Sequence, residues 1–227
     1  MIPNHIINSF YYREARILNK ARVVHLDTLQ LDFSNKTILE TGCGGVGDIT
    51  SYLLEKNAIV TLNDYRQENI QSLLLNINKD LPYNNWDLNE HVSFDNKFDI
   101  VVCYGTLYHL TKLETAFQNL ANLCKDYTII STQTSGKNDD QINILYEGGT
   151  NEQSSNSYGC RPGRLLVWNE LKKNFKYVYC VKTQPDNVDY PLQFPSDNSS
   201  SRNIFIGSHI ELNNDKFVSE LLNSYTI

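Results

Sequence analysis

The sequence lacks the features that mark membrane proteins, disulfide-rich secreted proteins and nucleic-acid binders. None of its apolar runs approaches the length of a membrane span, and its first residues lack the charged start and apolar middle of a signal peptide. The five cysteines are scattered, with no paired spacing that suggests zinc or a disulfide framework. The net charge of −6 includes no stripe of Lys and Arg, which phosphate binding needs. We therefore expect a protein of the reducing cytoplasm, with a small-molecule partner and no nucleic-acid partner.

Length and composition predict one globular domain. A chain of 227 residues is long enough for one sizeable core and too short for two comfortable domains. Hydrophobic residues make up 41% and charged residues 20% of the chain, which is ordinary for a globular protein. Because the sequence has no internal repeat and no convincing domain boundary, we treat residues 1–227 as a single domain.

Short β-like runs alternate with helix-length stretches in the first part of the chain. Apolar or β-branched residues fill runs at 37–40, 58–63, 99–104 and 127–132, and a weaker strand candidate lies at 84–88. Apolar residues recur at helical spacing in 48–56, 67–77 and 113–123. Repeated strand–helix units imply parallel strands with right-handed crossovers. The sequence therefore predicts a Rossmann-like, doubly wound α/β fold with helices on both faces of the sheet.

The C-terminal third changes character. Residues 136–163 form a long polar stretch rich in Gly, Ser and Asn, and a loop of that length usually is a lid, a binding loop or disordered. An amphipathic helix is predicted at 164–175, and strands at 177–183 and 203–210. Because no helix separates these two strands, we expect antiparallel pairing at one edge of the sheet.

The motif Gly42-x-Gly44-x-x-Gly47 lies between the strand predicted at 37–40 and the helix predicted at 48–56. Glycines in this context let the chain turn sharply and let backbone N–H groups approach a ligand. Glu40, at the strand end, separates two kinds of ligand, because a carboxylate there would repel a pyrophosphate and attract an ammonium group. A glycine-rich turn without a ligand, and a Glu40 that faces solvent, are the alternatives.

Asp64 ends the second predicted strand, at about the distance expected for an acid that accepts hydrogen bonds from both ribose hydroxyls. Acidic residues at strand ends are often only solvated. The nearby Glu40 and glycines strengthen the interpretation of Asp64 as a ribose-binding residue. S-adenosylmethionine carries an ammonium and a sulfonium and no phosphate. It therefore fits this combination better than a nicotinamide dinucleotide does.

Four segments resemble the class I S-adenosylmethionine-dependent methyltransferases: ILETGCGGVG (38–47), VTLND (60–64), WDL (86–88) and FDIVVCYGTLYHL (98–110). They correspond to the cofactor loop, the ribose acid, the adenine segment, and the fourth strand with its active-site turn. The resemblance covers residues 35–135 and implies a seven-stranded sheet in the order 3-2-1-4-5-7-6, with strand 7 antiparallel. One departure is Asn63, which precedes the acid where a Gly-Val or similar pair is more usual. It leaves open how Asp64 is aimed.

The same resemblance implies S-adenosylmethionine as the cofactor and assigns residues to its parts. Glu40 and Gly42 would face its methionine end, Asp64 its ribose, and Asp87 with Leu88 its adenine. The full set of cofactor-binding residues that we expect is Glu40, Gly42, Cys43, Gly44, Asp64, Tyr65, Asp87, Leu88 and Tyr104.

The C-terminal part is similar to a branch of methyltransferases found beside, or fused to, glycosyltransferases. The similarity rests on GCRPGRLLVWNELKKNFKYVYCVKTQPDNVDYPLQF (159–194) and SRNIFIGS (201–208). It implies O-methylation of a sugar hydroxyl in glycan assembly. The expected partners are a glycan or small-molecule acceptor and glycosyltransferases of the same pathway, or a fused domain.

His109, in the turn after the fourth strand, is the candidate general base. Methyl transfer to an alcohol is an in-line displacement during which the alcohol proton must leave, and imidazole titrates near neutral pH. The strand end places His109 at the crevice where the reacting methyl group should lie. The alternative is a histidine that caps the following helix or packs against the cofactor loop. Tyr104 and Tyr108 could line the path of the methyl group.

Segments outside the core (35–135) are expected to close over the crevice. Residues 1–34 would form a helical lid, with Tyr11, Tyr12 or Arg13 touching the cofactor, and residues 136–163 a substrate loop. Residues 164–227 would form the C-terminal helix and antiparallel strands. Arginine offers a rigid fork of donors that suits hydroxyls and anions of an acceptor. The predicted substrate-binding residues are Tyr108, Glu147, Arg161 and Arg164.

No metal is expected, because no histidine pair or carboxylate cluster has the spacing of metal ligands. Asp139, Asp140 and Glu147 are the acids that a metal site in the loop would use. Two other functions stay open: a NAD-dependent oxidoreductase, since the G-x-G-x-x-G is complete, and a non-catalytic binding module of the same fold. Among methyltransferases, a tRNA or another small metabolite is the competing acceptor.

Overall fold

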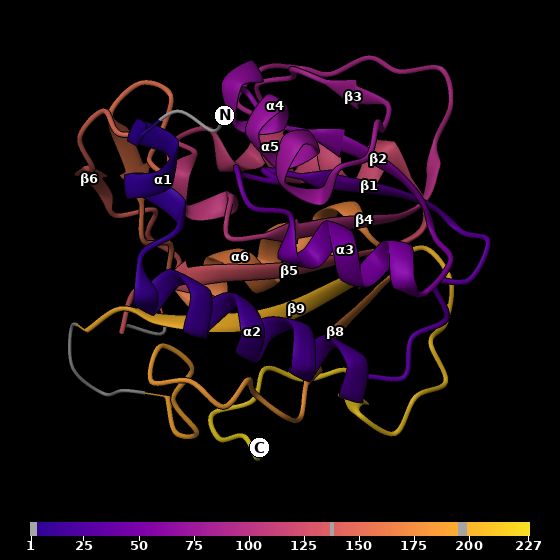
Figure 1. Cartoon of the computed structure of the whole chain (residues 1–227). Helices are drawn as coiled ribbons and strands as arrows, with labels where there is room; N and C mark the ends of the chain where they lie inside the picture. The colour runs from indigo at the N-terminus through magenta and orange to yellow at the C-terminus, as the bar shows by residue number, and fades with distance from the viewer. Residues whose placement is uncertain (1–3, 137–138, 195–198) are drawn as a thin grey trace.

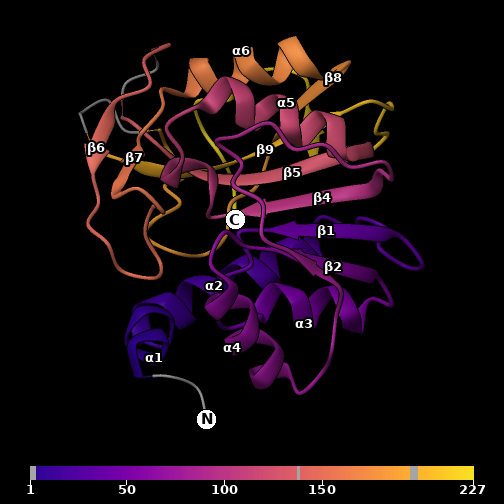
Figure 2. The same ribbon diagram turned by 90° about the horizontal axis from the view of Figure 1, so that it is seen from above.

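The computed structural model describes residues 4–136, 139–194 and 199–227. One mixed sheet crosses the molecule, with helices on both sides of it (Figure 1). Helices α5 (Leu113–Leu123) and α6 (Arg164–Asn174) cover one face. Helices α2 (Arg13–Thr28), α3 (Asp48–Glu55) and α4 (Gln67–Ile77) cover the other, as the view from above shows (Figure 2). The predicted Rossmann-like α/β fold is confirmed.

Within the described residues the sheet has eight strands, in the order β3-β2-β1-β4-β5-β9-β8-β10. The parallel part consists of β1 (Thr37–Thr41), β2 (Ile59–Asn63), β3 (Tyr83–Asn84), β4 (Phe98–Tyr104) and β5 (Cys124–Thr134). Antiparallel pairs join β5 to β9 (Ser201–Ser208) and β9 to β8 (Tyr177–Val181). The prediction of seven strands is wrong, because β10 (Phe217–Val218) adds an antiparallel edge strand outside β8. A two-residue strand has no periodicity by which the sequence could mark it.

The third strand is shorter than predicted and begins earlier. A strand was expected at 84–88, whereas β3 covers only Tyr83–Asn84, parallel to the end of β2. The residues that follow leave the sheet because Asn63 binds them: the Trp86 N–H donates to Asn63 Oδ1 at 2.9 Å. The adenine segment predicted from the resemblance is therefore a loop held against the end of β2.

Strands β1 and β4 are buried on both faces, which explains their unbroken apolar runs. Ile38 and Ile100 belong to the core between the sheet and α2, α3 and α4. Their neighbours Leu39 and Val101 belong to the core between the sheet and α5 and α6. All four side chains are fully buried. With both faces covered, the carboxyl ends of the strands are the edge where polar side chains can gather.

The helices follow the periodicity of the sequence closely. Helices α4 and α5 have the predicted bounds, and α3 and α6 end one residue earlier than predicted. A further short helix, α1 (Asn4–Phe10), precedes α2. None of the helices in the described ranges is both long and apolar enough to cross a membrane.

The stretch 136–163, predicted as a loop, contains a small second sheet. Strands β6 (Ile144–Tyr146) and β7 (Tyr158–Cys160) pair antiparallel, and we call residues 144–160 the arm. The arm packs on a 3-10 helix, η1 (Leu107–His109), which follows β4. A side chain at Gly159 would lie within 2.6 Å of the Tyr108 carbonyl oxygen and the Glu147 carboxylate, so only glycine permits this contact. The arm is thus held against the turn that carries His109.

Candidate active site

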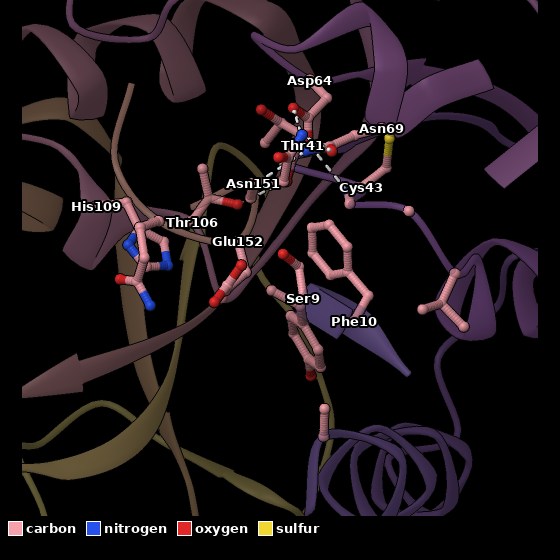
Figure 3. Close-up of a pocket in the computed structure, with 18 of the residues that line it drawn as sticks. Ser9, Phe10, Thr41, Cys43, Asp64, Asn69, Thr106, His109, Asn151 and Glu152 are labelled. Atoms are coloured by element: carbon pink, nitrogen blue, oxygen red, sulfur yellow. Dashed lines mark hydrogen bonds between the residues drawn. The ribbon is translucent and has the colours of Figure 1, made fainter. Parts of the chain in front are cut away.

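A cavity of about 430 Å³ lies at the carboxyl ends of the parallel strands, a size typical of small-molecule sites. We distinguish two facing parts of its lining. The glycine-loop half consists of residues 40–47, 63–66 and 86–88. Across the cavity, as Figure 3 shows for His109 opposite Cys43 and Asn69, lies the histidine half. It consists of Tyr108, His109, Gln133, Arg161, Asp189 and Arg202.

The glycine loop packs directly on the turn after β4. Gly42 has a φ of +66°, and a Cβ there would lie 1.8 Å from Thr106 Oγ1, so no other residue fits. Thr106 Oγ1 in turn donates to the Thr41 carbonyl at 3.0 Å. The N–H groups of Gly42 and Cys43 both donate to the Asn63 carbonyl, at 2.7 and 3.2 Å. The loop is therefore a rigid backbone surface joined to the ends of three strands.

Glu40 is buried inside this half of the cavity, with 4% of its surface exposed, so the alternative of a solvent-facing side chain is wrong. Its carboxylate accepts a hydrogen bond from Thr50 Oγ1 at 2.6 Å and forms no ion pair with a described residue. Burial raises the pKa of Glu40 to about 8. A buried carboxylate without a cation favours a positively charged ligand over a phosphate, which fits S-adenosylmethionine.

Asp64 is buried at the end of β2 and is already a hydrogen-bond acceptor. The Gly44 N–H donates to Oδ2 at 3.0 Å, and the Arg66 N–H and Asn69 Nδ2 donate to Oδ1 at 2.9 and 3.1 Å. Burial raises the pKa of Asp64 despite these donors. An ionised carboxylate offers about four acceptor positions, so one on Oδ2 is left for a ligand hydroxyl. We predicted that Asp64 accepts hydrogen bonds from both ribose hydroxyls, and this geometry leaves room for one of them.

Asn63, the departure from the family pattern, links β2 to its neighbours. Its Nδ2 donates to Thr41 Oγ1 at 3.2 Å and to the Trp86 carbonyl at 3.4 Å. Asp87 follows, and its Oδ1 accepts from both the N–H and the side-chain amide of Asn89, at 2.9 and 3.1 Å. Asn63 thus fixes the segment that carries Asp87 and Leu88 beside the strand end from which Asp64 projects.

The N-terminal residues lie over the glycine loop. The Phe10 ring is 3.1 Å from the position of a Cβ on Gly44, and the Tyr11 hydroxyl lies 3.5 Å from the Gly45 carbonyl oxygen. Phe10 and Tyr12 line the cavity, and Arg13 does not. Three further residues that we predicted to bind the cofactor also line the cavity: Cys43, Tyr65 and Tyr104. The Tyr104 hydroxyl is buried without a partner among the described residues.

His109 is paired with a carboxylate from the arm. Its Nδ1 lies 2.6 Å from Glu147 Oε2, and the Glu147 side chain is only 2% exposed. Burial opposes the charged imidazole, but Tyr108 and Glu147 hold the pKa of His109 above its usual value. Burial likewise opposes the charged carboxylate, but His109 and Arg161 keep the pKa of Glu147 low. Since Nδ1 is engaged, Nε2 is the nitrogen left for another group.

Tyr108 lies between two guanidinium groups. Arg202 Nη2 donates to its hydroxyl at 3.1 Å, and the guanidinium carbons of Arg202 and Arg161 lie 4.9 and 5.0 Å from the ring centroid. Burial alone would raise the pKa of Tyr108, but Arg202, His109 and Arg22 lower it to about 7. The histidine half therefore contains two groups whose pKa values are displaced by their neighbours, upward for His109 and downward to about 7 for Tyr108.

The arm is tied to α4 as well as to His109. Arg66 donates through Nη1 to the carbonyls of Asn151 and Gln153, at 3.4 and 2.8 Å, and through Nη2 to that of Ser154 at 3.1 Å. Asn69, which binds Asp64, also donates to the Asn151 carbonyl at 3.2 Å. The arm therefore bridges the two halves of the cavity.

Two predicted substrate residues do not line the cavity. Arg164 is fully buried and donates to the Leu222 carbonyl, to the Tyr225 hydroxyl at 2.7 Å and to Asn223 Oδ1 at 3.4 Å. It anchors the C-terminal segment, so we withdraw it from the substrate site. Glu147 lies behind His109, where it binds that ring and Arg161. Tyr108 and Arg161 do line the cavity.

Sequence reasoning missed several lining residues. Arg202 and Asp189 form an ion pair, with 3.2 Å between Nε and Oδ2, and Gln133 lies at the end of β5. Arg202 lies between Ser201 and Asn203 at the polar start of β9, so no sequence pattern marked it as a cavity residue. Asp189 and Arg22 stand in polar surroundings without a distinctive pattern. Among the described residues, no three His, Cys, Asp or Glu side chains are grouped as metal ligands.

Residues 39–130 match a protein-family model described as a methyltransferase domain. The match covers β1 to β5, which supply the glycine-loop half and His109. None of the curated proteins compared with the chain matches it significantly.

Solved methyltransferase structures share the fold. The N-terminal domain of EvdMO1 with S-adenosylhomocysteine bound has 14% sequence identity and a TM-score of 0.63, over 85% of this chain and 80% of that one. That domain was also solved in the presence of S-adenosylhomocysteine and D-fucose, with a TM-score of 0.61 and 14% identity over 87% and 83% of the two chains. The 1,6-didemethyltoxoflavin-N1-methyltransferase of Burkholderia thailandensis has 14% identity and a TM-score of 0.56, over 89% and 84%.

Likeness at these identities concerns the fold alone. The methyltransferase-domain match includes the glycine-loop half of the cavity and His109, and the buried Glu40, which has no ion-pair partner among the described residues, suits a cationic ligand. The protein is a methyltransferase, and S-adenosylmethionine is its cofactor.

Proposed function

We propose that this S-adenosylmethionine-dependent methyltransferase transfers a methyl group to a hydroxyl group of a sugar in glycan biosynthesis. The observation that carries the proposal is the contact of 2.6 Å between His109 and Glu147 at the edge of a polar cavity. A transfer to a hydroxyl needs a group that takes a proton, and a histidine oriented by a carboxylate is suited to that task.

The glycine-loop half would hold the cofactor. Glu40 and Gly42 would face its methionine end, and Asp64 would accept from a ribose hydroxyl through the free position on Oδ2. Asp87 would accept from the adenine amine through Oδ2, because Asn89 occupies Oδ1. Leu88, which is buried, would pack beside the adenine. The remaining expected contacts are those of Cys43, Gly44, Tyr65 and Tyr104.

The bound cofactor supplies a methyl group already activated on a sulfonium, so the protein's tasks are alignment and proton transfer. His109 Nε2 would accept the proton of the acceptor hydroxyl as its oxygen attacks. Glu147 would keep the ring in one orientation and stabilise the imidazolium that forms. Because a base must be neutral to act, and the pKa of His109 is raised, activity should rise with pH as His109 loses its proton.

The lining of the histidine half favours a polyhydroxylated acceptor over an apolar one. Gln133, Arg161, Asp189 and Arg202 present amide, guanidinium and carboxylate groups, which can all bond to hydroxyls. The C-terminal similarity to methyltransferases of glycan assembly and the fold shared with EvdMO1 point the same way. Glycosyltransferases of the same pathway, or a fused domain, are the partners that we propose, in the cytoplasm.

A methyl-release assay over activated and lipid-linked sugars, with mass and linkage analysis of the product, tests the proposal. We expect a mass increase of one methyl group on a hexose or deoxysugar hydroxyl. The H109Q variant should lose this activity, and replacement of the exposed His91 by Gln should not affect it. Methylation confined to nitrogen, to RNA or to an apolar acceptor would refute the sugar assignment.

A further inference from the structure

Arg22 is a buried cation that forms no ion pair with a carboxylate of the described residues. It is 7% exposed, in the second half of α2, and Arg always carries its charge in proteins. Its described partners are neutral: Nε donates to the Tyr190 hydroxyl at 3.1 Å and Nη1 to Asn19 Oδ1 at 3.2 Å. Nη2 has no partner among the described residues. Burial of an unpaired charge is strongly unfavourable, so an arrangement of this kind calls for an anionic ligand.

The other arginines of the cavity lining are already engaged. Arg161 pairs with Glu147, and Arg202 pairs with Asp189. Arg66 donates to three backbone carbonyls of the arm. Arg22 is therefore the cavity-lining guanidinium, within the described part of the chain, that has neither a carboxylate nor a full set of acceptors.

Arg22 lies beside Gly105, in the turn that follows β4. A Cβ on Gly105, whose φ is +93°, would be only 3.3 Å from Arg22 Nη2, so the missing side chain makes room for the guanidinium. The next residue, Thr106, binds the Thr41 carbonyl at the end of β1. On its other side, Arg22 reaches the start of α3 through Asn19, whose Nδ2 donates to Asp48 Oδ2 at 3.1 Å. Both connections end at residues that flank the glycine loop.

Glu40 and Arg22 are an acidic and a basic side chain that could each bind an opposite charge of a ligand. Both line the same cavity, both are more than nine-tenths buried, and neither forms an ion pair with a described residue. A ligand that carried only one charge would leave the other residue uncompensated. An α-amino acid carries an ammonium and a carboxylate on the same carbon atom and would offer a partner to both.

We propose that Arg22 binds the carboxylate of the methionine portion of the cofactor, while Glu40 binds its ammonium group. The inference rests on the cofactor placement in the proposed function and adds a residue from outside the methyltransferase-domain match. Tyr104, whose buried hydroxyl also lacks a described partner, is a second donor available to this carboxylate.

Calorimetric binding of three probes tests the assignment: S-adenosylhomocysteine, its decarboxylated analogue, and 5′-methylthioadenosine, which lacks the whole amino-acid portion. Charge-assisted hydrogen bonds predict that R22Q weakens binding of S-adenosylhomocysteine about 10- to 100-fold. It should change the affinity for the other two probes less than about twofold, since neither carries a carboxylate. R22K keeps the positive charge but loses the paired guanidinium donors. It should lose less affinity for S-adenosylhomocysteine than R22Q, again without a change for the other two probes. K20Q, an exposed charge on the same helix, is the matched control and should bind all three probes as the wild type does.

The probes separate the ways in which the idea can fail. An equal loss for all three probes in R22Q and R22K would mean that Arg22 only supports the fold and would overturn the assignment. Unchanged binding of S-adenosylhomocysteine would also overturn it and leave the proposed function intact. Failure of the wild type to bind any probe would refute the cofactor placement itself. Selective loss with intact binding of 5′-methylthioadenosine is the predicted result.

Discussion

In the glycine-loop half of the cavity, the hydrogen bonds to the two buried acids come from residues close in sequence. Thr50 donates to Glu40 ten residues away, and Gly44 donates to Asp64 twenty residues away. In the histidine half they come from distant segments, since His109 and Glu147 are 38 residues apart and Tyr108 and Arg202 are 94 apart. One half is thus made by two adjacent strand–loop–helix units. The other is assembled where the arm and the start of β9 meet the turn that follows β4.

This difference suggests a division of tasks. The glycine-loop half presents backbone groups and buried acids that can bind a ligand. The histidine half presents His109, which pairs with Glu147, and Tyr108, whose pKa is lowered to about 7. Substitutions in the first half should therefore change cofactor affinity with little effect on the pH profile. Substitutions in the second should change the rate and its pH dependence with little effect on cofactor affinity.

The largest effect is expected for H109Q. General-base catalysis typically contributes about 100- to 10,000-fold, so kcat should fall by that factor. The dissociation constant of S-adenosylhomocysteine should stay within about twofold of the wild-type value, because the ring is opposite the glycine loop. Steady-state kinetics and calorimetry on the same preparation measure both. A variant with full activity would show that His109 only packs there.

Asp64 tests the other half. D64N keeps the shape but loses the charge that strengthens hydrogen bonds to a hydroxyl, so S-adenosylhomocysteine should bind about 10- to 100-fold more weakly. The pH midpoint of kcat at saturating cofactor should not move. Should that midpoint shift together with the affinity, the two halves would not be separable in the way proposed.

Glu147 affects the rate through His109. In E147Q the carboxylate that helps to raise the pKa of His109 is gone, so the acid limb of the kcat profile should move to lower pH. At the plateau, kcat should fall about tenfold, because the ring loses a charged orienting partner. A profile of kcat from pH 5 to 9 measures both. An unmoved acid limb would indicate that another group, such as Tyr108, controls it.

The smallest effect on catalysis is expected for R164M. Arg164 does not line the cavity and binds the C-terminal segment, so the KM values for both substrates should change less than about twofold. Stability should fall by about 2–4 kcal/mol, because several buried acceptors lose their donor. Urea unfolding gives the free energy. A large rise in the acceptor KM without loss of stability would return Arg164 to the substrate site.

The predictable parts of the molecule are those encoded by contiguous patterns. The periodicity of α4 and α5 fixed their bounds, and the position of Glu40 and Asp64 at strand ends placed both in the cavity. The edge strand β10 and the hairpin of the arm were not predicted. Strands of two or three residues form because neighbouring strands pair with them, and their own sequence has no strand pattern. The sequence did not predict Arg22 as a cavity residue for a related reason. A charged residue on an amphipathic helix is usually solvated, and only the packing of the folded chain shows that this one is buried.

Proton release on cofactor binding tests the central electrostatic claim most directly. With a pKa of about 8, most Glu40 side chains are protonated at pH 7, and a bound ammonium group should lower that pKa and expel the proton. Calorimetry of S-adenosylhomocysteine binding in buffers of different ionisation enthalpy should report release of up to about 0.9 proton per site at pH 7, and much less for E40Q. No release from the wild type, or an equal release from E40Q, would contradict the account.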